Sequence, residues 1–187
     1  PNQLRLHAFT HIASGADGVM YGNWHSIHQR FETYWKGILS HDLKPSRIYN
    51  EISEIGNEIK TLTKEKLCIK KKNRIALLVD TLSLSALKWF PIDKKLSYND
   101  VVRYMYDSLY EENLECDVIF SEYANPNEYE AIICPALYCV SKELTKKLDS
   151  FVKNGGILIG SFRSFVADRR VSVYTKTLPA GLTDCFG

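Results

Sequence analysis

Aromatic side chains that could stack on a sugar ring lie close together in one segment of the sequence. Trp24, Tyr34 and Trp35 belong to it, and His25 directly follows the first of them. An aromatic face packs well against the apolar C–H face of a pyranose, and its polar edge remains free for hydrogen bonds. His25 is predicted to line the same cleft as a hydrogen-bonding residue. Packing in a hydrophobic core is the alternative for the three aromatic residues.

Histidine and carboxylate residues in the first part of the chain could instead bind a metal ion. His25, His28 and Glu32 can meet on one face of a turn or helix, and His7 and His11 are four residues apart. The sequence offers no further ligand at a suitable spacing, so we predict no metal site. We expect His28 to be exposed, and we expect His7 and His11 to flank a packed surface.

Two features of the second half suggest other chemistries without completing them. Cys139 follows a predicted strand, as the nucleophile of class I glutamine amidotransferases does, but it has no flanking glycine and no histidine follows residue 41. The segment Asp80–Ser85 could be a phosphate-binding loop after a strand, but it lacks glycine, and Asp80 would repel phosphate. We therefore predict neither thiol catalysis nor a bound nucleotide, flavin or other cofactor.

The elements expected to position the aromatic segment are a helix, a strand and a second helix. Apolar spacing and Gly15 predict a helix over residues 2–14, and the apolar run Gly18–Tyr21 predicts a buried strand. Tyr34 and Trp35 would lie on a helix beyond the carboxyl end of that strand, where α/β proteins bind ligands. A stripe of isoleucines predicts a long helix over residues 45–62.

A lysine-rich joint separates this part from a second unit in which strands and helices alternate. Ser97 and Asp100 form a capping-box-like helix start, and Ser141 caps a further helix that ends at 154–156. Alternating elements favour a parallel sheet, and the flavodoxin-like, doubly wound α/β arrangement is the commonest small solution. The predicted strands are 74–79, 116–120, 129–135 and 157–160, and the predicted helices are 97–113 and 141–153.

Composition excludes several classes of function. The formal net charge of +2 arises from 24 basic and 22 acidic residues spread along the chain, so we expect no nucleic-acid partner. No apolar run is long enough to span a membrane. The five cysteines lack metal-binding spacing and favour reduced thiols and a cytoplasmic location. Because Pro1 already lies in a helical pattern, we expect the chain to be cut from a longer protein.

Several strings together resemble glycoside hydrolase family 42, the β-galactosidases with a trimerisation domain. They are the run His11–Tyr21, Trp24, Glu32, the helix end Phe151–Gly156 and the final stretch from residue 178. The resemblance implies a C-terminal fragment of a TIM (β/α)8 barrel over residues 1–62, a linker over 63–73 and a trimerisation-like domain over 74–187. It also implies a homotrimer. The second domain would share the class I glutamine amidotransferase-like, flavodoxin-like fold.

For activity, the family implies retaining hydrolysis of terminal β-linked sugars by two glutamates, one acid/base and one nucleophile. Both would lie upstream of Pro1, so this chain is expected to contain no catalytic residue and to be inactive alone. Glu32 matches a family glutamate that holds sugar hydroxyls, through charge-assisted hydrogen bonds. With Trp24, His25 and Trp35 it forms the predicted substrate-binding set.

The sequence departs from the family pattern in this segment. The family usually has Phe-Arg-Trp-Arg where this chain has Gly22–His25, and a histidine where this chain has Trp35. Galactose specificity is therefore an open point. The alternative from another class is a non-catalytic assembly or ligand-binding α/β module.

Overall fold

The protein was analysed as a computed structural model that describes residues 2–64, 72–91 and 93–187. The chain divides into two compact units, Pro1–Lys71 and Lys72–Gly187. Each unit is described by itself. Most of the predicted linker over 63–73 lies outside the described residues, and so does Cys68.

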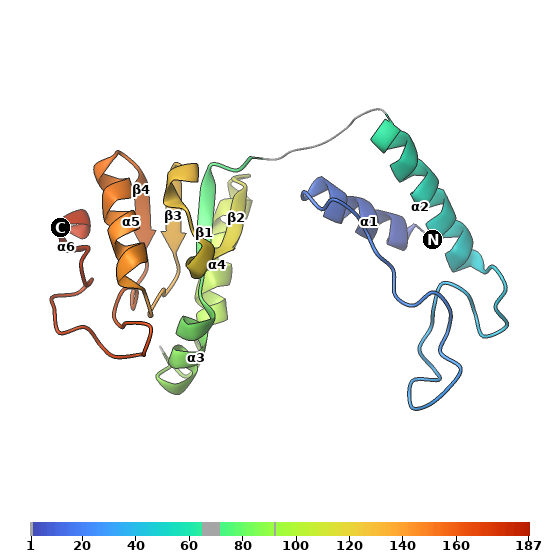
Figure 1. The fold of residues 1–187 in the computed structure, drawn as a ribbon, viewed down its shortest axis with the longest axis horizontal. Coiled ribbons are helices and arrows are strands. Elements are labelled where there is room, and N and C mark those ends of the chain that lie inside the picture. The colour runs from blue at the N-terminus through green and yellow to red at the C-terminus, as the bar shows by residue number, and fades with distance from the viewer. Residues whose placement is uncertain (1, 65–71, 92) are drawn as a thin grey trace. The chain divides into compact units, whose positions relative to one another are not determined.

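The first unit consists of two helices joined by a long irregular segment (Figure 1). Helix α1 spans Gln3–Ala13, and helix α2 spans Arg47–Lys64, so both predicted helices are confirmed. The two helices pack on each other, and Arg5 on α1 forms an ion pair of 2.9 Å with Glu58 on α2. Ile55, in the isoleucine stripe of α2, is only 2% exposed.

Two expectations about the irregular segment are wrong. Residues 18–21 do not form a strand, and Met20 is 95% exposed. A strand needs backbone partners on a neighbouring strand, and among residues 2–64 this run pairs with none. Residues 31–34 form turns, so neither Tyr34 nor Trp35 lies on a helix.

The second unit is an α/β layer built on four parallel strands (Figure 1). Their order across the sheet is β2-β1-β3-β4, and every neighbouring pair is parallel. All four predicted strands are confirmed, although β3 is shorter at both ends than predicted. Their bounds are Ile75–Val79 for β1, Cys116–Phe120 for β2, Ala131–Cys134 for β3 and Ile157–Gly160 for β4.

Helices connect these strands and follow the predicted caps. Helix α4 begins with the expected capping box of Ser97 and Asp100, and the Ser141 side chain accepts a hydrogen bond from the first turn of α5. The sequence analysis missed α3, which begins directly after β1. The helical elements are α3 over Thr81–Trp89, α4 over Tyr98–Glu111, η1 over Ser121–Tyr123, η2 over Pro126–Glu128, α5 over Lys142–Lys153 and α6 over Thr183–Phe186.

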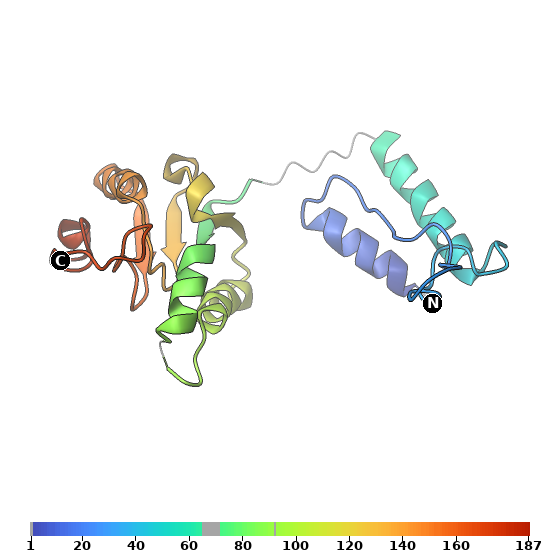
Figure 2. The same ribbon diagram turned by 60° about the horizontal axis from the view of Figure 1, so that its bottom comes forward.

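Helices lie on both faces of the sheet. Alternate side chains of the central strands, such as Ala76, Leu78 and Ile132, form one buried cluster with Leu148 of α5. A second buried cluster joins α3 and α4 to the segment after β3. Figures 1 and 2 agree that α5 and α4 lie on opposite sides of the sheet. None of the helices described here is long and apolar enough to cross a membrane.

Candidate functional site

The aromatic segment of the first unit is a loop that is hydrogen-bonded to itself. The amide of Leu39 donates to the carbonyl of Trp24 at 3.0 Å, and the amide of Ile27 donates to the carbonyl of Trp35 at 3.2 Å. The buried Ser26 hydroxyl donates to the carbonyl of Leu39 and accepts from the amide of Gly37, each at 3.2 Å. The loop therefore holds its backbone together while its large side chains remain outside.

Glycine is required at position 37 for this close approach. A Cβ atom at Gly37 would lie 2.2 Å from the carbonyl carbon of His25. Backbone atoms cannot yield as a flexible side-chain end can, so any larger residue would push the two halves of the loop apart.

The predicted sugar-contacting residues all lie on this loop, and their side chains are exposed. Trp24 is 61% exposed and Trp35 is 64% exposed, so neither packs in a core within this unit. Trp24 meets the ring of Tyr49 edge-on, with centroids 6.3 Å apart. The Glu32 side chain is also exposed, and among residues 2–64 its carboxylate has no hydrogen-bond or ion-pair partner. The backbone carbonyl of Glu32 accepts from the amide of Trp35 at 2.9 Å.

The histidines near this loop bind backbone carbonyls. His25 donates from Nδ1 to the carbonyl of Ser26 at 2.8 Å, and His28 donates from Nε2 to the carbonyl of His41 at 2.8 Å. The Nε2 atom of His41 lies 2.7 Å from the carbonyl oxygen of Thr33. Over the described ranges, no group of three or more His, Cys, Asp or Glu side chains is arranged to hold a metal ion.

In the second unit, the carboxyl ends of β1 and β2 carry a buried charge network that the sequence analysis did not find. Asp80 is 3% exposed and accepts from the Ser83 amide at 2.6 Å and the Ser121 hydroxyl at 2.7 Å. Arg169 donates to the same carboxylate at 2.5 Å and to Glu122 at 2.5 Å. Burial opposes ionisation, but the hydrogen bonds from Ser121, Ser83 and Arg169 outweigh it and lower the pKa of Asp80.

This network caps a helix and joins two loops, so it stabilises the fold. Asp80 is the N-cap of α3, and its partners come from η1 and from the loop after β4. An aspartate directly before an apolar helical run is a helix-start signal, so Asp80 could have located α3.

Cys139 lacks the surroundings of a nucleophile. It is fully buried, and burial, assisted by the charge of Asp80, raises the pKa of its thiol to about 11. The sharp turn after β3 is formed by Ala136, which has a φ of 41°. Cys139 lies beyond this turn, and its amide donates to Ser83 Oγ at 2.9 Å.

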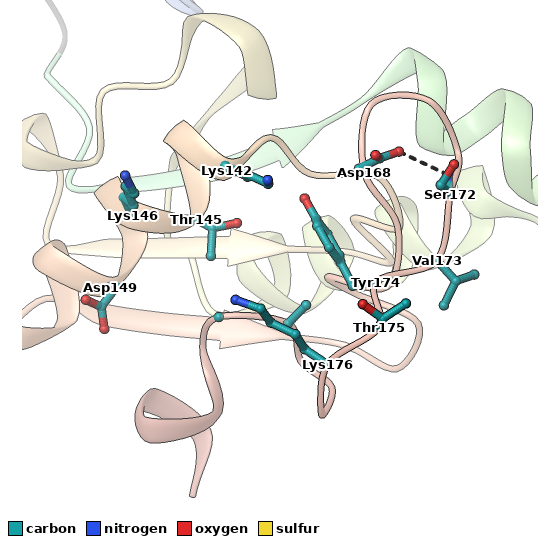
Figure 3. A pocket seen from close by; sticks show the side chains of 12 residues that line it. Lys142, Thr145, Lys146, Asp149, Asp168, Ser172, Val173, Tyr174, Thr175 and Lys176 are labelled. Atoms are coloured by element: carbon teal, nitrogen blue, oxygen red, sulfur yellow. Dashed lines mark hydrogen bonds between the residues drawn. The ribbon is translucent and has the colours of Figure 1, made fainter.

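A hollow of the second unit lies between α5 and the segment 168–181 (Figure 3). Its volume is about 510 Å³. Figure 3 shows Lys142 reaching from the start of α5 toward Tyr174 and Asp168, while Lys176 reaches back from the facing segment toward Thr145. The sequence analysis did not find this hollow, because its two walls are far apart in the sequence. The one local signal was the pair Lys142 and Lys146, one turn apart on α5.

Two family models match the chain in succession. The model described as "Beta-galactosidase" matches residues 1–62, and the model described as "Beta-galactosidase trimerisation domain" matches residues 73–187. The second match covers more than half of the chain.

Curated relatives match along the whole chain. The chain is 30% identical over 197 residues to β-galactosidase BgaB of Geobacillus sp. (strain Y412MC61), which covers 100% of this chain and 28% of that protein. It is 30% identical over 184 residues to β-galactosidase BgaH of Haloferax lucentense, covering 98% of this chain and 27% of that protein. The chain thus spans little more than a quarter of the length of these relatives.

Solved structures of β-galactosidases are similar as well. The β-galactosidase from Bacillus circulans sp. alkalophilus superposes with a TM-score of 0.87 at 25% identity, covering 98% of this chain and 27% of that one. Gan42B, a GH42 β-galactosidase from G. stearothermophilus, superposes with a TM-score of 0.77 at 28% identity, covering 90% and 25%.

Proposed function

The chain belongs to the β-galactosidase family GH42, and from that premise we propose that it is part of an enzyme that hydrolyses terminal β-linked galactosides. The observation that carries the proposal is the succession of the two family matches, over 1–62 and then 73–187, along one chain. The relatives named above all carry the name β-galactosidase, and the chain covers only about 28% of their length. The activity is therefore proposed for the longer protein.

In this proposal residues 1–62 are the C-terminal fragment of a (β/α)8 barrel, residues 63–73 are a linker and residues 74–187 are the self-association domain. The match of the β-galactosidase family model to residues 1–62 supports the first assignment. The sheet order β2-β1-β3-β4 supports a flavodoxin-like arrangement, since it matches the first four strands of the order 2-1-3-4-5.

The loop of the first unit would contribute part of the sugar site. Trp24 and Trp35 offer exposed aromatic faces for a pyranose ring. Glu32 offers a carboxylate that has no partner among residues 2–64 and can accept hydrogen bonds from sugar hydroxyls. His25 would line the same cleft. The acid/base and nucleophilic glutamates of a retaining mechanism would be supplied by the remainder of the barrel.

We expect the longer protein to hydrolyse o-nitrophenyl β-galactoside and the 187-residue chain alone to release no nitrophenol. The reason is that the chain would hold sugar contacts but neither catalytic carboxylate. Both proteins should be purified in parallel from a host that lacks its own β-galactosidase. Hydrolysis by the short chain, or cleavage of neither galactoside nor glucoside by the long protein, would contradict the proposal.

We expect the second unit to mediate assembly into a homotrimer. Sedimentation equilibrium of the longer protein should give three times the monomer mass, and a version that ends before residue 74 should sediment as a monomer. The truncation keeps the whole barrel intact, so association by an incomplete barrel cannot mimic the result. A monomeric longer protein, or a trimeric truncated one, would refute the assembly role.

A cytoplasmic location is also part of the proposal. Cys116, Cys134, Cys139 and Cys185 are all free thiols, which suits a reducing compartment.

A further inference from the structure

The hollow between α5 and the segment 168–181 has the size and shape of a small-molecule site. Its volume of about 510 Å³ lies within the range of protein ligand pockets, roughly 300–1,000 Å³. Buried residues form its floor, because Thr145 is 9% exposed and Ala180 is 5% exposed. All of its walls belong to the second unit, so the hollow does not depend on how the two units are arranged.

Positively charged side chains outnumber negatively charged ones around this hollow. Lys142, Lys146 and Lys176 line it, and none of them forms an ion pair with another described residue. The two aspartates on its wall have other hydrogen-bond partners, although Asp168 also attracts Lys142 electrostatically. Asp149 pairs with Lys153 at 2.8 Å, and Asp168 accepts from the amides of residues 170 and 172 at 2.8 and 3.0 Å. Three lysines against two aspartates leave an excess of one positive charge and three ammonium groups available to an anion.

Two hydroxyl groups of the hollow, those of Tyr174 and Thr145, are oriented to accept hydrogen bonds. The Tyr174 hydroxyl donates its proton to the carbonyl of Val140 at 2.9 Å, and the Thr145 hydroxyl donates to the carbonyl of Ser141 at 3.0 Å. Each oxygen therefore retains lone pairs but no free proton. Such oxygens bind a ligand's O–H groups, whereas lysines, which only donate, bind its anionic oxygens.

Lysines that donate and hydroxyl oxygens that accept hydrogen bonds line the same hollow, and a ligand that carries both an anionic group and hydroxyl groups would complement them. The side of the Tyr174 ring adds an apolar surface suited to the C–H face of a sugar (Figure 3). A phosphate monoester carries close to two negative charges at neutral pH, which matches converging lysines better than a single carboxylate does. We propose that this hollow is a binding site for a sugar phosphate.

In the proposed complex the phosphate lies between Lys142 and Lys176, and the sugar hydroxyls contact Thr145 and Tyr174. Lys146 contributes attraction from the rim, because its side chain points away from the floor in Figure 3. This site requires neither glycoside hydrolysis nor self-association, so it stands or falls separately from the function proposed above.

Isothermal titration calorimetry of the 187-residue chain tests the site with three probes: glucose 6-phosphate, glucose and inorganic phosphate. We expect glucose 6-phosphate to bind more tightly than either fragment alone, with an affinity that falls as salt is added. Lys142→Gln and Lys176→Gln should each weaken its binding by about tenfold, since each removes one charge-assisted hydrogen bond.

Lys147→Gln is the matched control, because Lys147 is exposed on the same helix but does not line the hollow. It should leave the affinity unchanged, and far-ultraviolet circular dichroism should show that all variants are folded. The proposal is overturned if glucose 6-phosphate does not bind, if it binds no more tightly than inorganic phosphate, or if the control weakens binding equally. It is also overturned if the two test variants alter sedimentation and leave binding intact, because the lysines would then serve contacts between copies.

Discussion

Replacement of Asp80 by alanine should lower the free energy of unfolding of the second unit by about 3 kcal/mol or more. The change removes the N-cap of α3 and the carboxylate that accepts from the Ser121 hydroxyl and the Arg169 guanidinium. Arg169 then keeps only Glu122. Urea unfolding of the intact chain, followed by circular dichroism, measures the effect. Faster hydrogen exchange at the backbone amides of Leu77 in β1 and Ile133 in β3 would show that the loss of stability includes the sheet.

Asp107→Ala is the control for this variant. Asp107 is exposed on α4, so its loss should change stability by no more than about 0.5 kcal/mol. If both substitutions cost the same, the network at the ends of β1 and β2 contributes no particular stability, and our account of it is wrong.

The same network should make the second unit sensitive to acid. The pKa of Asp80 in the folded protein lies below its ordinary value of 3.8, so its contribution is fully present above that value and is lost as the pH falls through the folded pKa. The exposed carboxylates of the chain also contribute to the pH dependence of stability. The difference in free energy of unfolding between wild type and Asp80→Asn measures the contribution of the Asp80 charge. This difference should shrink below about pH 4.

Replacement of Glu32 by glutamine in the longer enzyme should lower kcat/KM for o-nitrophenyl β-galactoside by about 100-fold. Glutamine keeps the shape of the side chain but loses the charge that strengthens hydrogen bonds from sugar hydroxyls. A series of substrates that each lack one sugar hydroxyl identifies the hydroxyl that Glu32 contacts. The substrate that lacks the hydroxyl bound by Glu32 should be cleaved almost equally by wild type and variant.

Glu54→Gln provides the comparison, because Glu54 is an exposed glutamate of the same unit that lies on α2. It should leave kcat/KM unchanged. An activity of Glu32→Gln within twofold of wild type would remove Glu32 from the proposed sugar site, and the exposed tryptophans would then need another explanation.

Most helices and strands were predictable because their signals are local. Ser97 with Asp100 and Ser141 mark helix starts, and the apolar runs at 75–79 and 157–160 mark strands. The failures occurred where a segment depends on distant partners. The run 18–21 has strand-forming residues, but a strand exists only when another strand supplies hydrogen bonds, and residues 2–64 supply none.

The candidate sites divide in the same way. Trp24, Glu32 and Trp35 were recognisable from residue type and order, and the structure places all three on one exposed loop. The loop conformation itself was not predictable, because it depends on Ser26 and Gly37 meeting across the loop. Whether the three side chains contact a sugar stays a prediction.

The sequence by itself determined the α/β alternation, the helix caps and the family, because each depends on residues near one another in the chain or on their linear order. Only the tertiary structure decided that Asp80 meets Arg169 and that Lys142 faces Lys176 across a hollow. Those pairs come from segments that adjoin only after parallel strands and their crossover helices have packed. Coulombic attraction and cavity shape depend on distances in space, which no local pattern of residues encodes.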